Sequence, residues 1–171
     1  MTNDAINFPS PYDPSRSAIH VRNEIHIEAS PERIWFWLTH AATWPDWYDD
    51  ASNVELEDGD THLSPTVNFK WRTFNTNISS EVKEFQPYQR LAWIARGTGL
   101  LAYHAWLIVP DHQGCKVITE ETQQGWLPSL AKWFIRKGLL KQHQRWLEGL
   151  KSKAETPNHH ISGLDEHILS V

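Results

Sequence analysis

Six short segments of alternating apolar and polar residues follow one another in the middle of the chain, and this run limits the fold more than any other feature. They span residues 53–57, 66–74, 78–85, 91–96, 101–109 and 116–123. The breaks between them are short and turn-like, as at Gln86–Gln89 and Asp111–Gly114. Such breaks cannot hold a crossover helix, so neighbouring strands must pair antiparallel. The run therefore predicts an antiparallel meander.

One more strand and two short helices precede this run. Residues 19–27 alternate cleanly between apolar and polar side chains, which is typical of a half-buried strand. In residues 29–40, Ser30 is suited to cap a helix and Pro31 to occupy its first position. Residues 42–50 predict a second short helix. These two helices lie between the first and second strands.

A single long helix is predicted over residues 128–154. Its buried stripe repeats at helical spacing and consists of Leu140, His143, Leu147 and Leu150. A seven-stranded sheet with one apolar face needs a cover, and only this helix is long enough to provide it. We therefore expect an α+β fold with an N-terminal arm (1–18), one domain (19–154) and a C-terminal tail (155–171).

Turn lengths predict which residues face each other across the sheet. The expected pairs are Phe69–Val82, Trp71–Ser80, Val82–Trp93, Glu84–Leu91, Trp93–His104, His104–Glu121 and Trp106–Thr119. This register gathers apolar side chains on one face and charged side chains on the other, whereas a one-residue slip would mix them. We therefore expect the first face to be the inner one, beneath the long helix.

His104 is then an ionisable residue on the inner face, among tryptophans and opposite Glu121. Three interpretations remain open: a satisfied buried pair, a polar anchor for a mostly apolar ligand, or an acid–base pair for catalysis. Four more polar side chains are expected on the inner face: Ser80, Glu84, Thr119 and Gln123. A core that served only stability would not need so many polar groups, because each requires a hydrogen-bond partner.

Several classes of function lack support in the sequence. No apolar run reaches the roughly 18 residues of a membrane-spanning helix, and the N-terminus has no secretory-signal pattern. We expect a cytoplasmic protein. The seven bases of residues 128–153 lack adjacent outward aromatic readout groups, so we expect no nucleic-acid binding. No cysteine–histidine spacing of a metal site and no phosphate-binding glycine loop occurs.

The layout resembles the helix-grip fold of START-related and pollen-allergen-related domains, and more narrowly the polyketide cyclase/dehydrase branch of that superfamily. The residues that carry the resemblance are ASPERIW (29–35), WPDW (44–47), RLAW (90–93), YHAW (103–106), TEETQQG (119–125) and QHQRWLEGLK (142–151). The resemblance implies a curved sheet wrapped around the last helix, with a cavity between them. It does not imply one function, because such a fold hosts many.

We favour binding of a small hydrophobic molecule, aromatic, acyl or polyketide-like, in that cavity. The expected ligand-binding residues are Phe69, Trp71, Ser80, Val82, Trp93, His104, Trp106, Thr119 and Glu121. One alternative is a cyclase- or dehydratase-like enzyme in which His104 and Glu121 exchange protons. A second alternative is a protein-interaction module that acts through its basic helix. We assign no catalytic residue, metal ligand or cofactor, and the sequence leaves the oligomeric state open.

Overall fold

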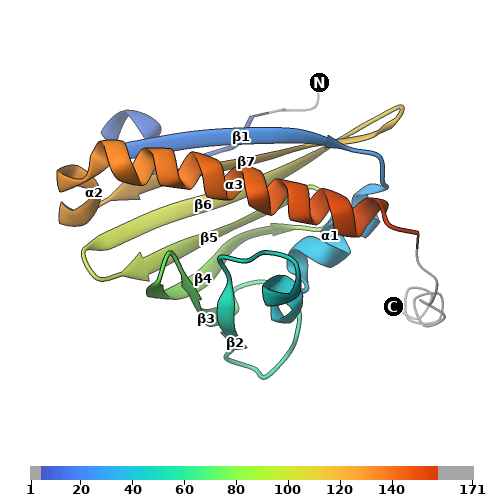
Figure 1. The fold of residues 1–171 in the computed structure, drawn as a ribbon, viewed down its shortest axis with the longest axis horizontal. Helices are drawn as coiled ribbons and strands as arrows, with labels where there is room; N and C mark the ends of the chain where they lie inside the picture. The colour runs from blue at the N-terminus through green and yellow to red at the C-terminus, as the bar shows by residue number, and fades with distance from the viewer. Residues whose placement is uncertain (1–4, 158–171) are drawn as a thin grey trace.

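One antiparallel sheet of seven strands dominates the computed structural model, which describes residues 5–157 (Figure 1). The strands are β1 (Ile19–Ile27), β2 (Ser52–Leu56), β3 (Asn68–Thr73), β4 (Thr76–Gln86), β5 (Arg90–Gly97), β6 (Leu100–Asp111) and β7 (Gly114–Gln124). Their order across the sheet is β1-β7-β6-β5-β4-β3-β2. The predicted meander is confirmed, and β1 closes the sheet by pairing with β7.

Helices cover the inner face of this sheet. Helix α1 (Pro31–Thr39) begins as predicted, because the Ser30 hydroxyl accepts a hydrogen bond from the Arg33 backbone N–H. The second short helix is the 3-10 helix η3 (Ala41–Asp46). The predicted continuous C-terminal helix is wrong in one respect, because α2 (Trp126–Leu130) precedes α3 (Lys132–Glu155). The chain turns at Ala131, where ψ reaches 26° and leaves the helical region.

The predicted register holds in the centre of the sheet and fails at the β3–β4 hairpin. Trp93 lies opposite His104, and His104 lies opposite Glu121, as expected. The β3–β4 turn has two residues, Phe74 and Asn75, both with positive φ, so that Thr73 pairs with Thr76, whereas the expected pairs imply that Thr73 lies opposite Ile78. Each expected pair therefore shifts by two residues, so that Phe69 faces Ser80 and Trp71 faces Ile78. A two-residue shift keeps every side chain on its predicted face.

A β-bulge between Val82 and Glu84 makes one prediction wrong, namely that Glu84 faces inward. Glu84 pairs with Ala92 rather than with Leu91, and Phe85 takes the place opposite Leu91. Ala92 belongs to the outer face, so the Glu84 side chain also points outward. Burial raises the pKa of Glu84, although the Arg90 guanidinium acts in the opposite direction.

The outer face carries an apolar patch that the charged pattern did not predict. Ala92, Ile94, Tyr103 and Ala105 form a small buried cluster there. The N-terminal segment covers it, because the Tyr12 ring stacks on Tyr103 at 5.2 Å and Phe8 packs beside them. The division into arm, domain and tail stays a prediction, and residues 158–171 of the tail lie outside the described residues.

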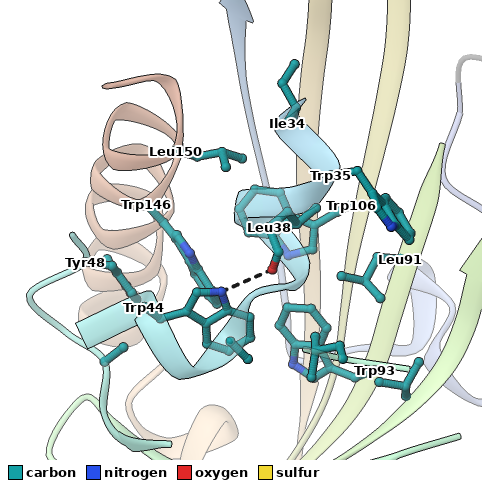
Figure 2. Packing of buried hydrophobic residues seen from close by; sticks show 14 of the residues in the cluster. Ile34, Trp35, Leu38, Trp44, Tyr48, Leu91, Trp93, Trp106, Trp146 and Leu150 are labelled. Atoms are coloured by element: carbon teal, nitrogen blue, oxygen red, sulfur yellow. Dashed lines mark hydrogen bonds between the residues drawn. The ribbon is translucent and has the colours of Figure 1, made fainter. Parts of the chain in front are cut away.

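Tryptophans fill much of the space between α3 and the inner face. Trp44, Trp93, Trp106 and Trp146 are fully buried in one cluster with α1 and η3 (Figure 2). The Trp44 indole donates a 3.1 Å hydrogen bond to the Leu38 carbonyl, which fixes η3 against the end of α1 (Figure 2). Within residues 5–157, no helix combines the length and the apolar character that crossing a bilayer requires.

Candidate functional site

A cavity of about 380 Å³ lies between the sheet and α3. Its walls are mainly apolar and include Trp71, Trp93, Leu100, Leu139 and Trp146. Its polar lining includes His104, Glu121, Gln123 and His143. A volume within about 300–1,000 Å³, with apolar walls and a few convergent polar groups, is typical of small-molecule sites. The cavity is therefore the candidate functional site.

The structure places four of the nine predicted ligand-binding residues in the cavity wall: Trp71, Trp93, His104 and Glu121. The other five do not line it. Phe69, Val82 and Trp106 are buried within the hydrophobic core, where Trp44 also packs. Ser80 accepts a 3.1 Å hydrogen bond from the Trp71 indole, and Thr119 lies behind His104. These two hydroxyl groups therefore support residues of the wall without reaching the cavity.

His104, Glu121 and His143 form a buried triad at the polar end of the cavity. His104 Nδ1 lies 3.1 Å from Glu121 Oε2, and His143 Nε2 lies 3.3 Å from the same oxygen. Gln123 Nε2 donates a 2.6 Å hydrogen bond to Glu121 Oε1. The cross-strand register brings the first two residues together, and the buried face of α3 adds His143.

Burial and neighbouring groups shift the pKa values of two members of the triad, His104 and Glu121. Burial lowers the pKa of His104 to about 3, and the neighbouring His143 acts in the same direction, while Glu121 opposes them. Burial alone raises the pKa of Glu121, but the hydrogen bond from His143 and the nearby imidazoles outweigh it and hold this pKa below its usual range. Glu121 is therefore a carboxylate and His104 a neutral imidazole near pH 7.

The neutral state of His104 decides its hydrogen bonds. A neutral imidazole has one N–H, and the carboxylate beside Nδ1 can only accept, so this N–H donates to Glu121. His104 Nε2 then accepts from the Thr119 hydroxyl at 2.8 Å. Both ring nitrogens of His104 are engaged by the protein. The expectation that His104 itself offers a polar atom to a ligand therefore loses its geometric basis.

His143 is the functional candidate that the sequence analysis missed. Its Nε2 donates to Glu121, whereas its Nδ1 is buried and has no hydrogen-bond partner among residues 5–157. A neutral imidazole that donates through Nε2 offers Nδ1 as an acceptor. Gln123 Oε1 is a second buried acceptor without a partner in the same part of the chain. The signal in the sequence was a histidine within an otherwise apolar helical stripe.

The triad also has the composition of a divalent-cation site. One ligand atom from each of His104, Glu121 and His143 lies within 4.8 Å of the others, and an ionised carboxylate with neutral imidazole suits such an ion. In the observed arrangement, however, both imidazoles approach Glu121 at hydrogen-bond distance. Coordination of a cation would replace those contacts. Three separate elements supply the ligands, which is why no local spacing in the sequence indicated them.

Comparison with solved structures places the fold among helix-grip proteins. Hypothetical protein jhp0584 from Helicobacter pylori superposes with a TM-score of 0.83 at 26% identity, over 90% of this chain and 98% of that chain. A START superfamily protein from Mycobacterium smegmatis gives a TM-score of 0.64 at 13% identity, over 80% of this chain and 97% of that chain.

A biosynthetic protein shows the same likeness over half of its length. The di-domain ARO/CYC protein BexL, of the BE-7585A biosynthetic pathway, gives a TM-score of 0.68 at 18% identity. The likeness covers 85% of this chain and 53% of that chain. Among curated proteins, no sequence matches. A family model described as polyketide cyclase / dehydrase and lipid transport matches residues 18–155, which is most of the chain.

Proposed function

We propose that this chain, which belongs to the polyketide cyclase / dehydrase and lipid transport family, binds a small and mostly apolar ligand in the cavity between the sheet and α3. The ligand class is aromatic, acyl or polyketide-like. The observation that carries the proposal is the cavity itself, about 380 Å³ in volume, with tryptophan in its walls and polar groups gathered at one end. Apolar walls supply most of the affinity, and a few polar groups fix orientation.

The polar end favours a hydroxyl or phenol over a carboxylate. Among residues 5–157, His143 Nδ1 and Gln123 Oε1 are acceptors without partners, and the indole N–H groups of Trp93 and Trp146 in the cavity wall are donors without partners. A ligand hydroxyl can both donate and accept a hydrogen bond. Glu121 is ionised and buried beside His143, so a ligand carboxylate would bring a second negative charge into a poorly solvated site. We therefore expect 2-naphthol to bind more tightly than 2-naphthoate, which has the same rings, by roughly tenfold or more.

A fluorescent apolar probe tests this proposal. N-phenyl-1-naphthylamine is titrated into the purified protein, and the two naphthalene compounds are added as competitors. Ala95→Leu adds bulk to the cavity wall and should abolish or strongly weaken probe binding. Arg96→Leu adds the same side chain at the next residue, which is exposed, and should leave binding unchanged. Equal probe affinity in both variants, or no probe binding by the wild type, would contradict the proposal.

Cyclase-type chemistry is a second candidate, and the unpartnered nitrogen of His143 favours it. Glu121 orients this imidazole through Nε2, which leaves Nδ1 as a base toward a bound substrate. The acid–base role expected for His104 thus passes to His143. In this case His143→Gln would abolish turnover of a poly-β-ketone analogue and keep its affinity, whereas a pure binding protein would show no turnover in the wild type.

A further inference from the structure

Four large apolar side chains are exposed to solvent around the turn between α2 and α3. Three of them are aromatic, so the expectation that the basic segment has no outward aromatic side chains is wrong. Trp126 is 60% exposed, Leu130 80%, Trp133 66% and Phe134 74%. Scattered exposed apolar residues are ordinary, but a contiguous group of this size marks a contact surface. We name these four residues the apolar patch.

The apolar patch lies at the mouth of the cavity. Phe134 belongs both to the patch and to the cavity wall, and Leu127, Pro128 and Ala131 between the patch residues also line the cavity. The tip of the β3–β4 hairpin faces them, since Phe74 is 40% exposed and lines the same cavity. Figure 1 shows α2 and the start of α3 together at one end of the molecule.

Basic residues surround the apolar patch. Lys132, Arg136 and Lys137 are exposed on the same turns, and the Lys137 ammonium lies 5.5 Å from the centre of the Trp133 ring. The sequence contains no acidic residue between Glu121 and Glu148, although the whole chain has a net charge of −5. The cavity mouth is thus a local positive surface on an acidic protein.

We propose that the apolar patch docks on the surface of a lipid bilayer that contains anionic phospholipids. Tryptophan and phenylalanine partition into the headgroup region, and lysine and arginine around them attract anionic lipid. A second copy of the chain fits this surface poorly. A two-fold contact through the patch would set Lys132, Arg136 and Lys137 against the same three charges.

Docking in this orientation opens the cavity toward the bilayer. The bilayer contact rests on the surface chemistry of the patch alone. Exchange of a ligand between cavity and bilayer rests, in addition, on the proposed function. The two are separable, because Leu130 and Trp133 belong to the patch and not to the cavity wall.

Vesicle sedimentation tests the proposal with the full chain. Vesicles of phosphatidylcholine alone are compared with vesicles that contain roughly one third phosphatidylserine, at low and high salt. We expect binding to the anionic vesicles at low salt, weakened at least tenfold by high salt or by neutral vesicles. The double variant Leu130→Ser/Trp133→Ser should lose binding at least tenfold, as should Lys132→Gln/Arg136→Gln/Lys137→Gln.

Tyr88→Ser is the matched control, because Tyr88 is another exposed aromatic side chain, on the β4–β5 turn, and does not line the cavity. It should bind vesicles like the wild type. The double variant should still bind N-phenyl-1-naphthylamine, so a loss of vesicle binding is distinguishable from a loss of the cavity. Vesicle binding that the double variant retains would overturn the proposal. So would an absence of vesicle binding by the wild type. A dimer, measured by light scattering, that the double variant dissociates would then show self-association through the patch.

Discussion

Replacing His104 by glutamine should change how the stability of this protein depends on pH. Burial lowers the pKa of His104 to about 3 in the folded chain, against an ordinary value of 6.5. Glutamine cannot titrate, yet its amide can still donate to Glu121 and accept from the Thr119 hydroxyl. The substitution therefore removes the titration and keeps polar partners for both neighbours.

The direction of the change in stability follows from the pH at which His104 is protonated in the folded and in the unfolded chain. Below pH 6.5 the imidazole of the unfolded chain is protonated, whereas the folded chain resists protonation until about pH 3. His104 therefore contributes stability that is fully present above pH 6.5 and is lost as the pH falls toward 3. A difference of one bound proton changes the free energy of unfolding by about 1.4 kcal/mol per pH unit. Because this difference develops mainly below pH 6.5, the free energy of unfolding falls by about 2 kcal/mol between pH 7 and pH 5.

Urea unfolding of wild type and His104→Gln across that pH range measures the difference. The wild type should lose about 2 kcal/mol more of its free energy of unfolding than the variant. Burial also lowers the pKa values of His40 and His62, but both residues remain in the variant and their effects cancel. The lowered pKa of Glu121 acts below this range. Two parallel curves of stability against pH would refute the reasoning.

Two further predictions concern packing. A Cβ on Gly149 would lie 2.5 Å from the Trp47 carbonyl oxygen, whereas a Cβ on Gly138 of the same helix would meet only one side-chain atom, at 3.8 Å. Gly149→Ala should therefore lower the free energy of unfolding by at least about 1 kcal/mol, and Gly138→Ala should raise it by about 0.5–1 kcal/mol, both by urea denaturation. Tyr12→Ala removes the ring stacked on Tyr103 and should lower the free energy of unfolding by about 1–2 kcal/mol in the same assay. An unchanged free energy of unfolding would show that the N-terminal segment adds nothing to stability.

The central strands could be predicted from the sequence because their turns are marked. Gly99 lies in the β5–β6 turn, and Gly114 directly follows the β6–β7 turn as the first residue of β7. Both have positive φ, so loop length and register follow from the residues themselves. The β3–β4 turn has no such mark. Phe74 and Asn75 take positive φ without a glycine, and the expected register of this hairpin was wrong by two residues. The bulge at Glu84 is equally unmarked by local residue types.

Part of the candidate site could likewise be predicted from the sequence, and part of it could not. His104 and Glu121 lie on adjacent strands, and a correct hairpin register was enough to bring them together. His143 comes from a helix whose position over the sheet depends on the packing of the whole core. Periodicity placed it on the buried face of that helix, but it could not show which strand lies beneath. The extent of the cavity is beyond local pattern for the same reason, because Trp44 of η3 occupies part of the inner face.

The two proposals together set the orientation of the ligand. In a bilayer, an amphipathic ligand holds its hydroxyl at the interface and its apolar part among the acyl chains. A protein docked through the apolar patch meets that hydroxyl first, and the acceptors His143 Nδ1 and Gln123 Oε1 lie at the polar end of the cavity. The ligand can therefore enter polar group first, without inverting. We therefore expect its apolar part to contact the wall residues Trp71, Trp93 and Leu139.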